Sequence, residues 1–468
     1  MITPIYFSIK NNYDYGQKEY NNKEKYEGEL KDGKREGYGT WKSDNEKYIG
    51  QWHNDKKDGN GKYIYKNGEY YIGQWKNDKR DKEGTIYKIQ NKQNKIIYEG
   101  EFSNDKKEGE GHYSFDNYYF IGQWYNDKRN GLGTIIYKNG NYFIGEWQND
   151  KRNGLGTIFY QNGDYYMGQW CNDQNIGEGI IYNEKGDIIY KGEFHNDKKE
   201  GKGIEYDKKG NIKYEGKFHN DMREGIGKYI FEDGIYYKGN FKEDKFNGYG
   251  QFFYNDGSIF HEGQFVNGDC EGEGFHIFEN KDYFIGTFKA DSMENGILYN
   301  SDGHKIYEGS FKNGIYNGNG KLYNKDNDGY YEGDFKDNQI VLGKEYYCTD
   351  KLKYEGTFKD GKYDGYGIFY YENGEIYEGE FVGGKKHGSG KEYYCKDKLK
   401  YEGKFVDDKY NDLQGKYYWP NGDYYVGGFS NGLKEGIGML YKFNNLLKGI
   451  LPLTNLYKND KCVFFNFK

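Results

Sequence analysis

The sequence has very little alanine and proline. Ala290 is its only alanine, and 3 prolines stand against 71 glycines in 468 residues. This balance excludes a collagen-like chain and is untypical of a flexible Gly/Pro-rich linker. Aliphatic residues are also few, because 56 tyrosines make up much of the 35% of residues that are hydrophobic. We therefore expect an ordered chain whose core is thin and aromatic.

The chain also lacks a basic excess, since 68 Lys and Arg residues face 75 Asp and Glu residues, giving a net charge of −7. We therefore expect no nucleic-acid partner. The 5 cysteines are far apart and form no Cys-x-x-C pair, which argues against a disulfide framework or a zinc module. We find neither an apolar run of about 18 residues nor a signal-peptide pattern. These absences predict a soluble, cytoplasmic protein.

One short pattern recurs along the chain: Tyr-x-Gly-x-(Trp/Phe), as in Tyr166-Met167-Gly168-Gln169-Trp170. With its glycine as the marker, we count 18 copies from Gly28 to Gly427, spaced 22 to 24 residues apart with one exception. Such a period indicates a repeat architecture. The repeat positions that we expect to be structural include Gly28, Gly50, Gly73, Gly100, Gly122, Gly145, Gly168, Gly192, Gly216, Trp52, Trp75, Trp124, Trp147 and Trp170.

Each copy reads as two antiparallel strands. The aromatic, glycine and tryptophan positions alternate, so they share one face of a strand. We expect the gap at the glycine to be filled by a ring from a neighbouring strand. An Asn-Asp pair such as Asn149-Asp150 then favours a turn. A Gly-x-Gly strand runs back to a second turn such as Asn162-Gly163, a strong hairpin signal. The predicted fold is all-β, an elongated single-layer antiparallel ribbon of stacked hairpins.

The two ends differ from the repeats. We predict a polar N-terminal arm at 1–25, a repeat array at 26–449 and an apolar C-terminal tail at 450–468. The arm is either loose or one extra strand. The tail contains Ile450-Leu451-Pro452-Leu453 and Val463-Phe464-Phe465. It either caps the exposed edge of the ribbon or anchors the chain to a membrane or partner.

Four copies lose part of the Gly-x-Gly motif, and one insertion, Lys88 to Lys95, lengthens a repeat. The departures are neutral decay, or they mark bends or docking points. The four altered motifs are Lys82-Glu83-Gly84, Glu294-Asn295-Gly296, Val341-Leu342-Gly343 and Leu413-Gln414-Gly415.

No catalytic constellation stands out. The Gly-x-Gly stretches lie within predicted strands rather than at the start of a helix, so they are not phosphate-binding loops. His53, His195 and His219 share one repeat position and read as surface residues. Asn324 to Gly329 hints at a calcium loop, but Phe335 stands where the last calcium-binding Glu should be, so we read an acidic turn. We expect no enzyme activity, metal or cofactor.

Basic pairs recur after the Asn-Asp turns. Such a row could contact anionic lipid headgroups. Neighbouring aspartates offset the positive charge of each pair, however, which favours an edge that is simply exposed to solvent. The candidate lipid-facing residues are Lys56, Lys57, Lys79, Arg80, Lys128, Arg129, Lys151 and Arg152.

The combined pattern, Tyr-x-Gly-x-(Trp/Phe)-x-Asn-Asp-Lys-x-x-Gly-x-Gly, resembles the MORN repeat (membrane occupation and recognition nexus) over residues 26–449. The resemblance implies an antiparallel β-ribbon. It also implies a place among proteins such as junctophilins, radial-spoke head proteins of cilia and basal-complex scaffolds of parasites. Where MORN segments are fused to enzymes, the activity lies in another domain.

The leading hypothesis is therefore a non-catalytic scaffold that binds other proteins of a large cytoskeletal assembly. By analogy with the family, and because the biased composition suggests a protist, we expect the ciliary axoneme and most specifically the radial spoke. The alternative is a peripheral membrane protein that binds anionic phospholipids or phosphoinositides. Self-association is compatible with both.

Overall fold

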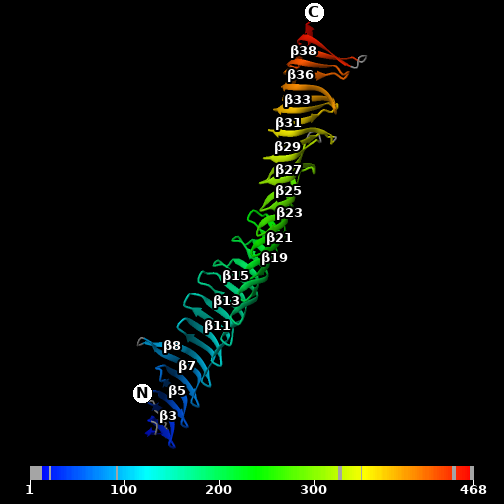
Figure 1. Cartoon of the computed structure of the whole chain (residues 1–468). Coiled ribbons are helices and arrows are strands. Elements are labelled where there is room, and N and C mark those ends of the chain that lie inside the picture. The colour runs from blue at the N-terminus through cyan, green and yellow to red at the C-terminus, as the bar shows by residue number, and fades with distance from the viewer. Residues whose placement is uncertain are drawn as a thin grey trace, which may run out of the picture. The chain divides into compact units, whose positions relative to one another are not determined.

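The computed structural model describes residues 13–20, 23–90, 93–324, 329–348, 350–444 and 449–463. Over these residues the chain forms strands and turns and no helix. It divides into two units: Met1–Phe231 with Lys242–Asp244, and Glu232–Phe241 with Lys245–Lys468. Within each unit, successive strands lie side by side (Figure 1).

In the first unit, every strand pairs antiparallel with the next strand along the chain. These strands are β1 (Asp14–Glu19), β2 (Lys25–Lys31), β3 (Lys34–Lys42), β4 (Lys47–His53), β5 (Lys56–Ile64), β6 (Tyr70–Lys76), β7 (Lys79–Gln90), β8 (Gln93–Ser103), β9 (Lys106–Ser114), β10 (Tyr118–Tyr125), β11 (Lys128–Tyr137), β12 (Tyr142–Gln148), β13 (Lys151–Phe159), β14 (Tyr165–Cys171), β15 (Gln174–Tyr182), β16 (Ile188–His195), β17 (Lys198–Tyr206), β18 (Ile212–His219) and β19 (Met222–Ile230).

The strands of the second unit also pair antiparallel. Its strands are β20 (Tyr236–Lys242), β21 (Lys245–Phe253), β22 (Ile259–Val266), β23 (Asp269–Ile277), β24 (Tyr283–Lys289), β25 (Ser292–Tyr299), β26 (Lys305–Lys312), β27 (Ile315–Tyr323), β28 (Tyr330–Lys336), β29 (Gln339–Tyr346), β30 (Leu352–Lys359), β31 (Lys362–Tyr370), β32 (Ile376–Val382), β33 (Lys385–Cys395), β34 (Lys398–Val406), β35 (Lys409–Tyr410), β36 (Asp412–Tyr418), β37 (Tyr424–Ser430), β38 (Leu433–Asn444), β39 (Gly449–Lys458) and β40 (Lys461–Val463). Strand β34 pairs with both β35 and β36. The predicted all-β hairpin ribbon is confirmed within each unit.

The two kinds of turn differ in which of their residues have positive φ. In the Asn-Asp turn, Asn149 and Asp150 both have positive φ, at 50° and 72°. This is the geometry of a tight two-residue hairpin, which Asn and Asp tolerate better than most residues. In the Asn-Gly turn only Gly163 has positive φ, and the loop closes between the N–H of Tyr160 and the carbonyl of Asp164. The tightest hairpin is therefore at Asn-Asp, not at Asn-Gly.

A row of paired glycines crosses each hairpin. Gly145 faces Gly156, which faces Gly168 on the next strand. A Cβ added to Gly145 would lie 2.6 Å from both the Gly156 Cα and the tip of the Phe143 ring. The ring that fills the gap thus comes from the glycine's own strand, two residues earlier, and extends over the partner glycine. The expectation of a ring from a neighbouring strand was therefore wrong for the marker glycine.

The tryptophans and the rings over the glycines form the core. Trp147 packs edge-to-face against Phe120 on one side, at 5.4 Å between ring centres, and against Phe143 on the other, at 5.6 Å. Trp170 repeats the contact between Phe143 and Tyr166. Each such pair adds about 0.5–1.5 kcal/mol beyond the burial of its area. In the first unit the single-layer sheet is thereby stabilised by a column of rings that runs from Tyr26 to Tyr214.

A bulge bends each hairpin beside this column. On β12 and β13, Gly145 faces Gly156 but Trp147 faces Arg152, so one residue on the first strand opposes three on the second. The surplus residues include Gly154, whose φ of 99° favours glycine. The bend brings the start of the second strand against the next tryptophan.

The ends add strands to the repeats. β1 pairs with β2, and β39 pairs with β38 along nine register positions before β40 follows. The inserted segment extends β7 and β8, where Lys88 faces Lys95. Capping by the tail stays a prediction, and Phe464 and Phe465 lie outside the described residues.

Candidate interaction surfaces

The aromatic face is occupied by the core. All five predicted tryptophans are buried, with exposed fractions of 4 to 7%. Their indole N–H groups donate to glycine carbonyls, as Trp170 Nε1 does to the oxygen of Gly156 at 3.2 Å. The nine predicted glycines all lie in the glycine row, opposite Gly39, Gly61, Gly84, Gly111, Gly133, Gly156, Gly179, Gly203 and Gly227.

At the edge formed by the Asn-Asp turns, the two residues of each basic pair have different surroundings. The second residue is half-buried. The Arg152 backbone N–H donates to the Asp173 carboxylate of the next turn at 3.0 Å, and Arg152 Nε donates to the same oxygen at 3.2 Å. Its guanidinium lies 4.1 Å from the centre of the Trp170 ring. Arg80 and Arg129 make the same contacts with Asp105 and Asp150, and Lys57 lies over Trp75.

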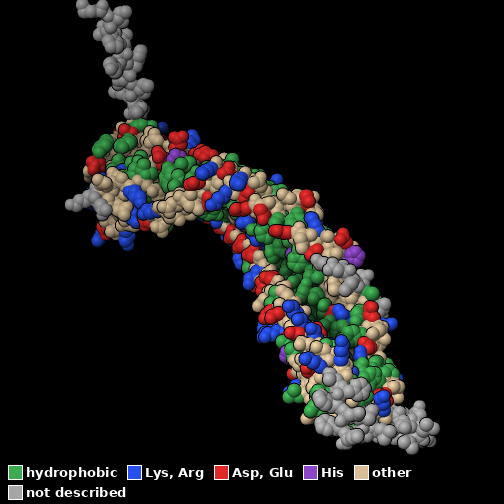
Figure 2. Space-filling view, turned by 90° about the horizontal axis from the view of Figure 1, so that it is seen from above, with side chains coloured by type: hydrophobic (Ala, Val, Ile, Leu, Met, Phe, Trp, Pro, Cys, Tyr) green, Lys and Arg blue, Asp and Glu red, His purple; other side chains and the backbone are tan. Residues whose placement is uncertain are grey.

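The first residue of each pair is exposed: Lys56, Lys79, Lys128 and Lys151. Lys151 Nζ contacts only the Asn172 side chain among the described residues, at 3.4 Å. The outward-facing part of the candidate lipid row is therefore one lysine in each repeat. Lys and Arg side chains are interspersed with Asp and Glu over the face shown in Figure 2. Lipid contact stays a prediction.

On the face opposite the core, the first unit carries a stretch of sheet without charge. We call this stretch the uncharged surface: two adjoining rows of side chains that run across β10–β15. Beside it, Leu132 and Leu155 lie in a third row, which also contains the exposed Glu146 opposite Leu132. Leu132 and Leu155 are the most exposed, at 63% and 62%, and Ile144 is 48% exposed. The two rows are Tyr119, Ile136, Tyr142, Phe159, Tyr165 and Tyr182, and Ile121, Thr134, Ile144, Thr157, Met167 and Ile180.

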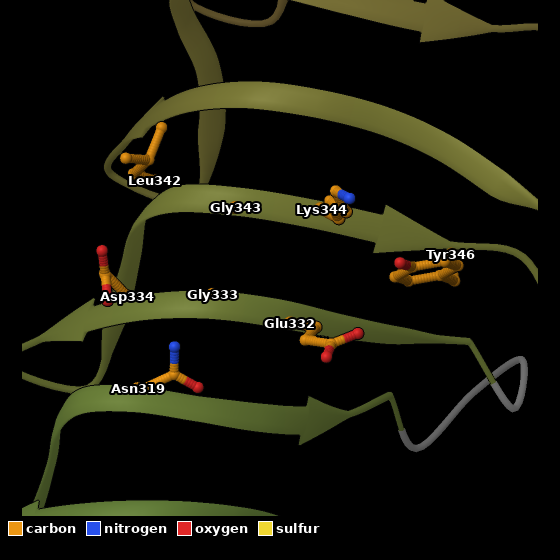
Figure 3. A pocket seen from close by; sticks show the side chains of 8 residues that line it. All are labelled: Asn319, Glu332, Gly333, Asp334, Leu342, Gly343, Lys344 and Tyr346. Carbon is orange, nitrogen blue, oxygen red and sulfur yellow. The ribbon is translucent and has the colours of Figure 1, made fainter.

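The same face of the second unit carries alternating charges instead. Figure 3 shows Glu332 on β28 and Lys344 on β29, which face each other in the register. Lys344 Nζ lies 3.6 Å from Glu355 Oε1 on β30. Opposite charges on neighbouring strands contribute about 0.2–1 kcal/mol per pair. Ile368 interrupts this charged ladder between Glu355 and Glu378, and the charged members are Glu308, Lys321, Glu332, Lys344, Glu355, Glu378, Lys391, Glu402 and Lys416.

One repeat replaces its core tyrosine by histidine. His261 is 4% exposed, faces His276 on β23, and has its Nε2 3.3 Å from the Cys270 Sγ. Burial lowers the pKa of His261 to about 4 and raises the pKa of Cys270 to about 12. Burial also lowers the pKa of His276. Both imidazoles are therefore neutral at pH 7, and the thiol is protonated.

The other histidines named from the sequence lie at the surface. His53 and His219 are exposed, and the Nδ1 of each lies 2.9 Å from a glutamate, Glu36 and Glu200 respectively. His195 is exposed as well. In the described part of the chain, no three His, Cys, Asp or Glu side chains are grouped so that they could hold a metal ion. The calcium-loop candidate includes 325–328, which lie outside the described residues.

Comparison with known families accounts for this repeated geometry. Fifteen segments match the MORN repeat, and together they cover more than half of the chain. The chain belongs to the MORN repeat family. The matched segments are 26–46, 48–70, 71–85, 98–118, 120–142, 143–165, 190–212, 214–236, 237–259, 261–283, 307–329, 354–376, 377–397, 414–424 and 425–445.

The structure extends the MORN array beyond the matched segments. The copies marked by Gly168, Gly286 and Gly333 fall between matches, yet each forms an antiparallel hairpin with a paired glycine. No curated protein matches the chain. Over the residues that the structure describes, no helix has the length and hydrophobicity to span a bilayer. The MORN repeat is typically a non-catalytic fold that mediates protein or membrane contacts.

Sequence reasoning did not identify the uncharged surface, the charged ladder or the His261 cluster. A signal was present for the first two: the variable residue before each marker glycine is Ile121, Ile144 and Met167 in three successive copies, and Glu308, Glu332 and Glu355 in three others. Only the register shows which residues lie between these positions on the intervening strands. They are threonines in the uncharged surface and lysines in the charged ladder.

Proposed function

We propose that this MORN-repeat chain is a scaffold in a cytoskeletal assembly, and that it binds a protein partner through the uncharged surface of β10–β15. That surface is the observation that carries the proposal. Monomeric soluble proteins rarely expose contiguous apolar patches larger than a few hundred Å². Six strands about 4.8 Å apart, with two rows of side chains, cover roughly 400 Å² in projection.

Within the cytoskeleton, the ciliary axoneme is the proposed location and the radial spoke the proposed structure. The support is the resemblance to MORN proteins of those assemblies and the chain's composition of repeats.

A detergent extraction compares the two candidate functions. The chain is tagged in its own cells, which are then treated with a non-ionic detergent. We expect it to stay with the insoluble cytoskeleton. Substituting Ile144→Glu together with Met167→Lys should release it. Both substitutions suit the fold, because Glu355 and Lys191 occupy the same repeat position in other copies. Retention of this double variant in the insoluble fraction would overturn the role of the uncharged surface.

The matched control is Glu99→Lys, which changes charge at the same repeat position outside the uncharged surface. It should remain insoluble with the natural chain. Cross-linking from the retained material then names the neighbouring proteins, and axonemal neighbours are expected.

The alternative candidate is a peripheral membrane protein, favoured by the exposed lysine of each basic pair. It predicts that the natural chain leaves the cells with the detergent-soluble lipids. It also predicts salt-sensitive flotation with phosphoinositide vesicles, weakened by changing Lys56, Lys79, Lys128 and Lys151 to glutamine. The mixed charges along that edge argue for the protein contact instead.

A further inference from the structure

Two repeats of the second unit are one residue shorter than the regular copies between their paired glycines. In a regular copy, Gly145 and Gly156 are eleven positions apart, whereas Gly286 and Gly296 are ten apart, as are Gly333 and Gly343. The missing residue comes from the bulge of the second strand. In the register, Thr287 faces Asn295 and Phe288 faces Met293. The bulge on the second strand therefore consists of the single residue Glu294.

Hollows in the surface coincide with these altered repeats. One of about 750 Å³ lies at the copy marked by Gly286. Another, of about 320 Å³, lies at the copy marked by Gly333 and is drawn in Figure 3. A third, of about 460 Å³ in the first unit, includes Glu83 and Gly84 of another altered copy. Each of these three hollows therefore includes residues of a repeat that lacks the full Gly-x-Gly motif.

The floor of the 750 Å³ hollow is apolar and is formed by Phe278, Met293, Leu298 and Tyr316. Met293 and Tyr316 occupy the position at which Arg152 covers a tryptophan in the first unit. Methionine has no group to bind the next Asn-Asp turn, and Tyr316 stacks on Tyr307 at 4.0 Å. The cation of the Arg152 copy is absent at these two positions, as it also is in the copies that place Asn175, Cys270, Ile340 and Tyr363 there.

The rim of this hollow is acidic. Glu279 is exposed and Asp282 is half-buried, and neither forms an ion pair with a described residue. Asp282 instead accepts hydrogen bonds from the Ser301 backbone N–H at 3.1 Å and from the Asn280 amide at 2.8 Å. An apolar floor with two carboxylates beside it complements an apolar segment that also carries a cation.

We propose that this hollow, which we call the apolar hollow, binds a segment of a partner protein that presents aliphatic side chains with a Lys or Arg beside them. The aliphatic groups enter between Met293 and Leu298, and the cation lies near Asp282. This site is separate from the uncharged surface, and neither proposal depends on the other.

The test uses methyl-labelled methionine in the full chain, which contains 5 methionines. The probe is a synthetic amphipathic peptide of leucine and lysine, compared with a leucine–glutamate peptide of the same pattern. We expect the Leu–Lys peptide to shift the Met293 methyl signal and to leave Met222 of the first unit unmoved. Met167 reports separately on the uncharged surface. Equal shifts with the Leu–Glu peptide, no shift of Met293, or an equal shift of Met222 would overturn the proposal.

Two variants locate the binding further. Met293→Arg restores the residue type of the first unit and should weaken binding of the Leu–Lys peptide about tenfold or more, measured by calorimetry. Asp282→Asn keeps the shape of the rim and should weaken binding about threefold, through loss of one charge contact. Glu294→Gln, an exposed change on the same strand, is the matched control and should bind like the natural chain. Unchanged binding by Asp282→Asn and Met293→Arg would contradict the site.

Discussion

The guanidinium of Arg152 lies 4.1 Å from the centre of the Trp170 ring, which belongs to the next hairpin. The contact joins the start of one second strand to the core of the following repeat. An isolated hairpin is only marginally stable in water, so contacts of this kind between neighbours are what make the array fold.

Arg152→Met should therefore loosen the junction between two repeats. It removes a cation–ring contact and a charge-assisted hydrogen bond, and we expect a loss of about 2 kcal/mol. Arg152→Lys should cost about half of that, because Lys57 makes a similar ring contact in another copy. The measurement is amide hydrogen exchange over β13 and β14, which reports local opening in an array that need not unfold in two states. Lys151→Ala, at the exposed neighbour, should change protection by less than about 0.5 kcal/mol.

The glycine row offers a comparison of two equivalent positions. An alanine Cβ at Gly145 would lie 2.6 Å from the Phe143 ring and from Gly156, and we expect Gly145→Ala to cost about 3 kcal/mol. At Gly263 the nearest atoms are 3.1 Å away, and His261 is at 3.5 Å. Gly263→Ala should cost about 1 kcal/mol. Urea unfolding of the two variants checks the order, and a larger loss at Gly263 would contradict this account of the row.

The repeated hairpins could be predicted from the sequence because the alternation of residues along a strand and the residues of a turn depend only on near neighbours in the chain. Placing Phe143, Gly145 and Trp147 on one face needs only the period of a strand. Which glycine the Phe143 ring covers depends on the register between strands, and that register follows from the bulge beside Trp147. The same bulge turns Arg152 onto Trp170, so a residue that reads as a surface cation is half-buried.

The candidate surfaces were harder to predict, since each is made by side chains from several strands. Ile144 and Thr157 become neighbours only in the paired sheet. The shortened repeat at Gly286 can be found in the sequence by counting residues between the paired glycines. The hollow beside it cannot be found in this way. The hollow lies where a bulge residue and a covering cation are both missing.

The His261 cluster predicts a loss of stability in acid. The folded pKa of about 4 lies below the usual 6.5, so between these values the unfolded chain binds more protons than the folded chain. Stability is then full above about pH 6.5 and falls as the pH drops toward 4, by up to about 3 kcal/mol. The lowered pKa of His276 acts in the same direction, while Asp291 and Glu262 partly oppose the shift of His261.

Urea unfolding followed by hydrogen exchange over β22 and β23 at pH 7 and pH 5 measures the change. His261→Tyr, the residue of other copies, should remove most of it, and an unaltered pH dependence in that variant would rule out His261 as its source.

Removal of one whole repeat tests the modular account of the fold. Deleting residues 143–165 joins Tyr142 directly to Tyr166, which then occupies the position of Phe143, so the order of first and second strands is kept. We expect the shortened chain to remain folded, with the same circular dichroism per residue, because each hairpin contacts mainly its neighbours. Deleting only 143–153 should unfold the region instead. That deletion removes β12 with its turn, so β13 would have to pair with β11, to which it runs parallel, through a loop too short for a parallel connection. Equal stability of the two deletions would show that the repeat is not the folding unit.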